Sequence, residues 1–131
     1  MLKHIYRWLQ DKKIFKIFAL FATLIVVFLS LKPPSQNPQS WTFLYLRGDL
    51  FLHFICYFVM TFLYLFAFYT QNNSLSKSAL ISLALGFVLE LLQLITFFQR
   101  FFDPFDLLAN SLGVLGAWLI IKGIFYYSLK E

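Results

Sequence analysis

Four long apolar runs divide the chain, with polar residues gathered between and near them. The runs cover residues 14–31, 50–69, 79–98 and 105–126. An α-helix needs about 20 residues to cross a hydrocarbon core of about 30 Å. The apolar residues are continuous, whereas the strands of a transmembrane β-barrel would alternate in short segments. We therefore predict an all-α membrane protein built as a bundle of four transmembrane helices.

The connections between the runs are short and contain helix-ending residues. Three prolines in the segment 32–40, KPPSQNPQS, prevent the first helix from continuing, and WTFLYLRGD then brings aromatic residues to the membrane interface. The polar connection QNNSLSKS is short enough to make the second and third helices antiparallel neighbours. Before the last run, Pro104 fits the first turn of a helix whose N-cap is Asp103.

The basic residues predict how the chain is oriented. With four spans, eight of the eleven basic residues lie on the side of the N-terminus. The positive-inside rule then places both termini in the cytoplasm. The segment before the first run places apolar residues at helical spacing among basic ones, which fits an interfacial helix. A frayed helical start, with charges that only set the topology, explains that segment equally well. Its apolar residues are Leu2, Ile5, Tyr6 and Leu9.

Composition narrows the function classes. The 131 residues are 60% hydrophobic and only 13% charged, which fits one membrane domain, residues 1–131, and no second domain. The net charge of +5 comes from residues placed as topology signals, so we predict no nucleic-acid partner. The single cysteine, Cys56, excludes an intrachain disulfide and a cysteine zinc cluster.

Each of the last three runs carries one polar stripe at helical spacing. We expect Gly86, Glu90, Gln93, Phe97 and Arg100 to share a face of the third helix. The second helix presents Asp49, His53 and Tyr57, and the fourth presents Asp106, Asn110, Gly113 and Ala117. Because the helices alternate in direction, the stripes meet in the outer half of the membrane. We predict an outward-opening polar pocket with Glu90 at its floor, formed by Asp49, His53, Tyr57, Glu90, Gln93, Arg100, Asp103, Asp106 and Asn110.

Several of these residues also have a structural explanation. Asp103 can simply cap a helix, and Gln93 and Asn110 can be hydrogen-bonding amides between helices. The small residues Ala109, Gly113 and Ala117 favour close helix packing. Glu90 is different, because a carboxyl group near the bilayer midplane usually marks a functional site or an obligatory ion pair.

The same residues carry a resemblance to a known family. The set Asp49, His53 and Tyr57, then Glu90-x-x-Gln93, then Arg100-x-x-Asp103-x-x-Asp106-x-x-x-Asn110-x-x-Gly113, resembles the signature of the VanZ-like family. These are small bacterial polytopic membrane proteins named after an accessory factor of teicoplanin resistance. The resemblance implies a multi-pass protein of the bacterial cytoplasmic (inner) membrane that serves the cell envelope and is linked, for the founding member, to glycopeptide susceptibility. One departure is Leu50, where the family often has a lysine.

Three functions remain open. In the first, the pocket binds a membrane lipid, a lipid-linked peptidoglycan precursor or another envelope component, and Arg100 pairs with an anionic group. Alternatively, His53 and Glu90 act as acid and base of a membrane-embedded enzyme, although no nucleophile motif accompanies them. Thirdly, the polar residues only hold the helices together and the bundle binds another membrane protein. Asp49, His53, Asp103 and Asp106 could ligate a metal, but no ligand-pair motif is present, so we predict neither metal nor cofactor. The oligomeric state is open.

Overall fold

Four long helices make up most of the computed structural model, which describes residues 4, 13–34, 42–69 and 71–128. They are α2 (Ile14–Leu31), α3 (Gly48–Ala67), α4 (Ser74–Leu92) and α5 (Pro104–Ser128). Each is long and apolar enough to cross a membrane. The predicted all-α bundle of four transmembrane helices is confirmed. The predicted interfacial helix before α2 lies outside the described residues.

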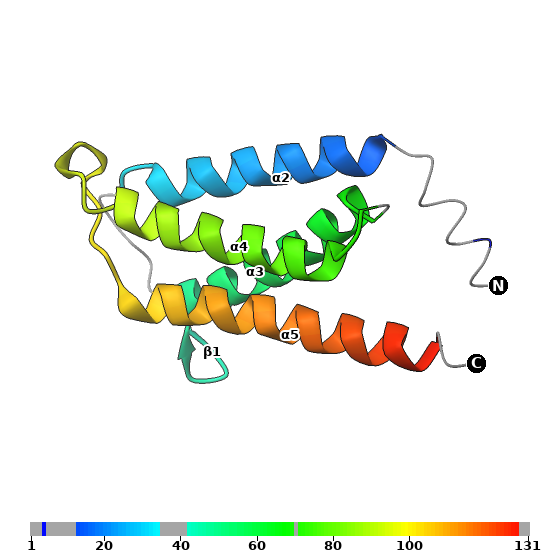
Figure 1. Cartoon of the computed structure of the whole chain (residues 1–131). Helices are drawn as coiled ribbons and strands as arrows, with labels where there is room; N and C mark the ends of the chain where they lie inside the picture. Colours follow the sequence, from blue (N-terminus) through cyan, green and yellow to red (C-terminus); the bar gives the residue numbers. More distant parts are fainter. Residues whose placement is uncertain (1–3, 5–12, 35–41, 70, 129–131) are drawn as a thin grey trace.

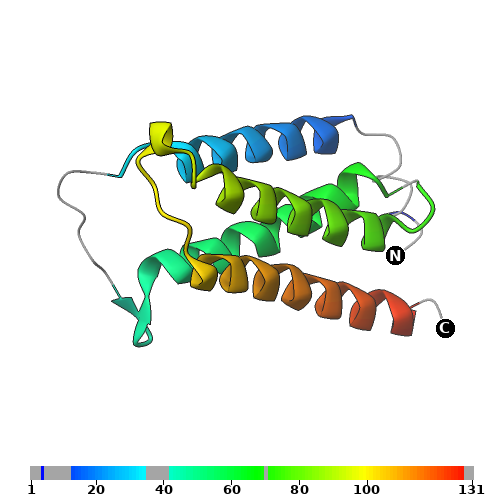
Figure 2. The same ribbon diagram turned by 60° about the vertical axis from the view of Figure 1, so that its left-hand side comes forward.

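The helices pack as an antiparallel bundle in which α3 contacts the other three. Figures 1 and 2 show α2 and α5 on opposite sides of the bundle, with α3 and α4 between them. The starts of α3 and α5 meet the ends of α2 and α4 at one end of the bundle. That end, called the site end below, gathers the residues of the predicted pocket.

The closest helix packing joins α3 to α5. A Cβ atom added to Gly113 would lie 2.3 Å from the carbonyl oxygen of Phe54, so only glycine permits this approach. Ala109 and Ala117, one turn away on either side, are also buried. Small residues at four-residue spacing let two helix backbones approach closely, as van der Waals packing in a membrane requires.

Polar side chains join the helices away from the site end too. The hydroxyl groups of Thr23 on α2 and Tyr64 on α3 are 2.6 Å apart. Thr61 on α3 donates to Ser82 on α4 at 3.2 Å. The sequence analysis did not single out these pairs, because threonine, serine and tyrosine scattered among apolar residues produce no stripe. Such contacts contribute about 0.6 kcal/mol each in membranes.

Helix α4 ends earlier than the sequence predicts. The predicted span was 79–98, whereas α4 covers Ser74–Leu92 and a short 3-10 helix, η1, covers Thr96–Phe98. Hydropathy does not mark this end, since the apolar run continues beyond it, but β-branched Ile95 and Thr96 lower the helix propensity there. Arg100 is therefore not on a helix shared with Glu90, and its predicted place on that stripe is wrong.

A small hairpin precedes α3, in the segment where the sequence predicted interfacial aromatic residues and no strands. Its strands are β1 (Thr42–Phe43) and β2 (Leu46–Arg47), which pair antiparallel. The two turn residues, Leu44 and Tyr45, both have positive φ, 47° and 66°. This backbone suits the twist of a two-residue hairpin, although glycine or asparagine usually supplies it. The hairpin places Arg47 directly before the first turn of α3.

Candidate functional site

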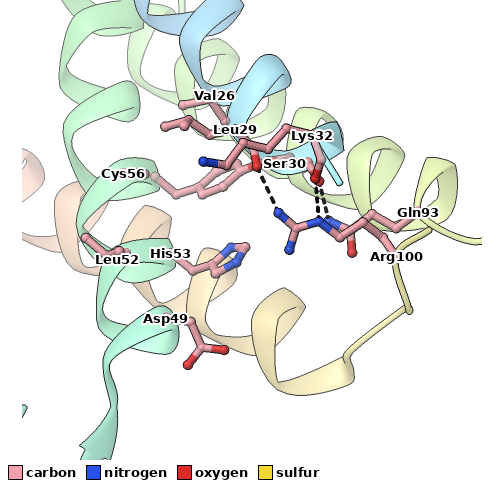
Figure 3. A pocket seen from close by; sticks show the side chains of 11 residues that line it. Val26, Leu29, Ser30, Lys32, Asp49, Leu52, His53, Cys56, Gln93 and Arg100 are labelled. Atoms are coloured by element: carbon pink, nitrogen blue, oxygen red, sulfur yellow. Dashed lines mark hydrogen bonds between the residues drawn. The ribbon is translucent and has the colours of Figure 1, made fainter. Parts of the chain in front are cut away.

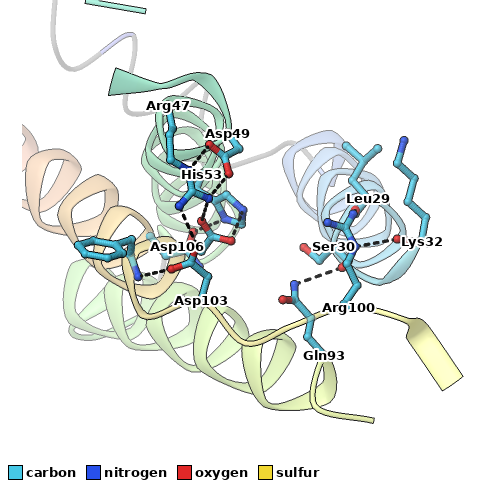
Figure 4. A network of polar contacts seen from close by, with 12 residues as sticks. Leu29, Ser30, Lys32, Arg47, Asp49, His53, Gln93, Arg100, Asp103 and Asp106 are labelled. Carbon is cyan, nitrogen blue, oxygen red and sulfur yellow. Dashed lines mark hydrogen bonds and ion pairs between the residues drawn. The ribbon is translucent and has the colours of Figure 1, made fainter. Parts of the chain in front are cut away.

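The polar residues at the site end form two separate groups (Figure 4). One group lies between the starts of α3 and α5 and contains Arg47, the carboxyl groups around it and His53. The other lies against the end of α2 and contains Gln93 and Arg100. The sequence analysis expected a single pocket, so the division is a new feature of the site.

Arg47 is the hub of the first group. Its guanidinium donates to both carboxylate oxygens of Asp49, with Nε 3.1 Å from Oδ1. It also donates from Nη1 to Asp103 Oδ2 at 2.9 Å and lies 3.9 Å from Asp106 Oδ1. Hydrogen bonds to Asp49 and Asp103 raise the pKa of Arg47 above its ordinary value. The guanidinium therefore stays charged and holds three carboxyl groups at the mouth of the helix pair.

Asp103 also caps α5. Its Oδ1 accepts the backbone N–H of Phe105 at 2.9 Å, and its carbonyl oxygen accepts the N–H groups of Asp106 and Leu107. The side chain therefore satisfies an N–H group that the first helical turn leaves unpaired. One carboxyl group thus performs the predicted capping role and binds Arg47 as well.

A more deeply buried layer lies below Arg47 and joins α3, α4 and α5. His53 Nδ1 is 2.9 Å from Asn110 Oδ1, and its Nε2 is 3.4 Å from Asp106 Oδ2. One ligand atom each from His53, Glu90 and Asp106 lies within 4.8 Å of the others. Glu90 and Asn110 are only 1% and 2% exposed. The three helices therefore bring an imidazole, two carboxyl groups and an amide together.

Not every polar atom in this layer has a partner. Among the described residues, Glu90 Oε2, Asp106 Oδ1 and Asn110 Nδ2 are buried without a hydrogen bond. Leaving such an atom unpaired costs about 1 to 3 kcal/mol, and more when the group is charged. The unpaired carboxylate oxygens can therefore bind a cation, and the unpaired amide nitrogen can donate a further hydrogen bond.

Tyr57 and Gly86 close the inner side of this layer. The Tyr57 ring is 2% exposed. A Cβ atom at Gly86 would lie 3.0 Å from Tyr57 Cε1 and 3.2 Å from Asn110 Nδ2. Gly86 therefore leaves room for both the ring and the amide.

The second group holds the end of α2. Arg100 donates from Nε to the carbonyl oxygen of Lys32 at 2.9 Å and from Nη2 to that of Leu29 at 3.2 Å. Gln93 donates to the carbonyl oxygen of Ser30 at 3.2 Å. The last carbonyls of a helix lack intrahelical partners and favour a positive charge nearby. Arg100 thus faces α2, not Asp106 and Asn110 as the stripe predicted.

A cavity of about 300 Å³ opens between α2 and α3 beside this second group (Figure 3). Its apolar wall includes Val26, Leu29, Leu52 and Cys56. Its polar wall comprises Ser30, Lys32, Asp49, His53, Tyr57, Gln93 and Arg100. His53 and Tyr57 separate this cavity from the buried layer of Glu90, Asp106 and Asn110.

All nine predicted pocket residues lie at the site end, but they do not line one space. Arg47 and Lys32 were missed as site residues and treated only as topology charges. Three carboxyl groups at two neighbouring helix starts require a counter-charge, and Arg47 is adjacent in sequence to Asp49. The sequence could therefore have predicted Arg47 as a site residue. No equivalent signal identified Lys32.

The whole sequence was compared with known protein families. The sequence matches the VanZ/LLP1 family over residues 5–126. The chain belongs to the VanZ/LLP1 family. No curated protein sequence and no solved structure gives a significant match. The VanZ/LLP1 membership confirms the resemblance and, with the four long apolar helices, a multi-pass membrane protein. Leu50 stands where the resemblance implies a lysine, while Arg47 supplies a positive charge beside Asp49.

Proposed function

We propose that this VanZ/LLP1 protein binds a lipid-linked envelope component with an anionic head group in the cavity between α2 and α3. The observation that carries the proposal is one cavity with an apolar wall and two basic side chains, Lys32 and Arg100. An amphipathic ligand fits such a cavity, because its apolar chain can contact the apolar wall and its anionic head group can contact the basic side chains.

The two kinds of wall lie at different depths. Lys32 is the C-cap of α2, whereas Val26 lies six residues earlier, about 9 Å deeper by helical rise. On α3, Asp49 is in the first turn and Cys56 two turns further in. The charged residues Lys32 and Asp49 are therefore at the end of the helices, and Val26 and Cys56 extend the cavity toward the bilayer centre.

The cavity also reaches the surface that the lipid chains would contact. Leu29 and Leu52, which line it, are 45% and 50% exposed. Because both belong to helices with transmembrane length, an acyl or prenyl chain could enter from the side without passing through water.

Arg100 and Lys32 provide the charge for the head group. Arg100 uses Nε and Nη2 on the end of α2, and its Nη1 has no hydrogen-bond partner among the described residues. Lys32 is exposed, and its Nζ likewise has none there. Asp49 also lines the cavity, but its carboxylate is bound by Arg47. A phosphate or carboxylate would therefore find free donors from two cations.

Lipid retention tests this proposal. The protein is purified in mild detergent, and its lipid extract is analysed by mass spectrometry. We expect wild type to retain an anionic lipid or lipid-linked precursor, and Lys32→Gln and Arg100→Ala to retain several-fold less. Lys16→Gln is the matched control, since Lys16 is exposed near the other end of α2. Equal retention by wild type and Lys32→Gln would reject the proposal.

The same experiment separates a binder from an enzyme. If the retained lipid is converted when it is supplied to purified protein, the membrane-embedded enzyme is favoured over simple binding. Orientation by the positive-inside rule places the cavity on the outer side, where envelope precursors are used. The founding member's link to teicoplanin makes glycopeptide susceptibility the first cellular phenotype to measure with these variants.

A further inference from the structure

We infer that His53, Glu90 and Asp106 form a binding site for a divalent metal ion of the Zn²⁺ or Mn²⁺ type, buried between α3, α4 and α5. The inference does not depend on the lipid proposal: His53 also lines the cavity, but Glu90 and Asp106 do not. It also goes against the expectation from sequence, which found no metal motif.

The spacing of the three side chains fits a cation. One nitrogen and two carboxylate oxygens lie within 4.8 Å of one another, and His53 Nε2 lies 3.4 Å from Asp106 Oδ2. Two ligands bound at about 2.1 Å in tetrahedral geometry are about 3.4 Å apart. The oxygen of Glu90 lies within 4.8 Å of both and would move closer when a metal ion binds.

The histidine is already arranged as a metal ligand. The amide oxygen of Asn110 can only accept, so the contact at 2.9 Å makes Nδ1 of His53 the donor. In the neutral ring, Nε2 then carries a lone pair that faces the carboxylate oxygen of Asp106. A positive charge between these two atoms would satisfy both, and a bound metal ion would supply it. Histidine ligands usually donate their other N–H to such an oxygen, which fixes the tautomer.

The unpaired buried atoms point to the same conclusion. Glu90 is 1% exposed, and its Oε2 has no hydrogen-bond partner among the described residues. Asp106 Oδ1 is unpaired in the same way. A carboxyl group buried at membrane depth needs a counter-charge. Arg47 donates hydrogen bonds to Asp49 and Asp103 and reaches Asp106 Oδ1 at 3.9 Å without a hydrogen bond. It therefore balances the charge of Asp106 only in part, and no ion pair joins it to Glu90 among the described residues.

One imidazole and two carboxylates suit a first-row divalent cation. Imidazole favours zinc, and carboxylate oxygens favour manganese and magnesium. Three protein ligands leave a coordination position for water or another small ligand. A motif search fails here because each helix supplies only one ligand, and the helix packing alone brings them together.

Metal analysis of purified protein tests the inference. The protein carries no polyhistidine tag, is stripped with EDTA in lipid-free detergent, and is then equilibrated separately with Zn²⁺, Mn²⁺ or Mg²⁺. After gel filtration, elemental mass spectrometry should find one Zn²⁺ or Mn²⁺ per chain. The melting temperature should rise with that metal and fall again with EDTA.

Two aspartates near the start of α5 provide a matched pair of variants. Asp106→Asn removes a ligand and should abolish stoichiometric metal. Asp103→Asn keeps a capping side chain outside the ligand set and should retain it. Asn110→Ala should weaken binding roughly 10- to 100-fold, as the loss of a partner of a ligand does.

Several outcomes would overturn the metal site. They are no retained metal in wild type, equal loss in both aspartate variants, or a melting temperature that does not respond to any of the three ions. If the cluster holds a shared proton and no metal, Glu90→Gln should be as stable as wild type, and its melting temperature should not respond to metal ions. Lipid retention measured after EDTA treatment keeps this result separate from the fate of the lipid proposal.

Discussion

The guanidinium of Arg100 binds the carbonyl oxygen of Lys32, 68 residues earlier in the chain, with Nε 2.9 Å from the oxygen. A second bond reaches the carbonyl of Leu29. Together they attach the segment after α4 to the end of α2, the helix with the fewest buried residues in the bundle. Arg100 is therefore both a wall of the cavity and the residue that fixes α2 beside it.

From this contact we expect Arg100→Lys to destabilise the bundle by about 1 to 2 kcal/mol. Lysine keeps the charge but cannot reproduce the two fixed directions of a guanidinium. Thermal unfolding in detergent, followed by circular dichroism, measures the change. Lys16→Arg, near the other end of α2, is the control and should leave the melting temperature unchanged. An unaltered melting temperature for Arg100→Lys would show that the α2 attachment is unimportant.

Gly113 offers a sharper test of helix packing. In Gly113→Ala the added methyl would lie 2.3 Å from the Phe54 carbonyl oxygen, so α5 must move away from α3. We expect a loss of about 1 to 3 kcal/mol of stability. Gly123→Ala is the matched control on the same helix, because nothing lies within 4 Å of its Cβ position. It should be neutral or stabilising by up to about 1 kcal/mol. Equal effects of the two substitutions would contradict this packing.

The sequence predicted the helices well because a membrane demands long apolar runs. α2 matches its predicted span residue for residue, and α3 begins only two residues early. The end of α4 was missed because Leu94 and Ile95 are as apolar as the helix before them. Hydropathy measures which residues lipid tolerates and does not measure where the backbone stops being helical.

The site was predicted in part for a related reason. His53, Asp106 and Asn110 lie on continuous helices, so their spacing gives their faces directly. Arg100 follows a helix end and two turns, and its direction depends on backbone angles that no periodicity encodes. The position of Arg47 depends on the hairpin. The turn residues Leu44 and Tyr45 have positive φ although neither is glycine, so the sequence does not indicate this turn.

Arg47 should serve to hold the neighbouring carboxylates in place more than to stabilise the folded protein. Its side chain is 52% exposed, so its ion pairs with Asp49 and Asp103 are screened by solvent. We expect Arg47→Gln to cost less than about 1 kcal/mol. The pairs raise the pKa of Arg47, and stability from a raised pKa is lost only as pH rises through the folded value. The folded-state pKa of Arg47 lies above the pH range in which unfolding can be measured. The difference in melting temperature between wild type and variant should therefore stay constant from about pH 7 to pH 9. A difference that disappears toward pH 9 would be inconsistent with a permanently charged Arg47.

The orientation of the bundle is the last prediction. α2 begins and α5 ends at the same end of the bundle, so a membrane-spanning arrangement puts both on one side. A four-span topology assigns eight of the eleven basic residues to that side, which the positive-inside rule predicts to be cytoplasmic. Fusion of green fluorescent protein after Glu131 should fluoresce, whereas alkaline phosphatase fused there should be inactive. Alkaline phosphatase inserted after Pro34 should be active, because the connection between Lys32 and Arg47 lies at the opposite end of the bundle from the termini and is predicted to be outside. The reverse pattern would place the cavity and the cluster of His53, Glu90 and Asp106 toward the cytoplasm, and the ligand would have to be sought among cytoplasmic lipid intermediates.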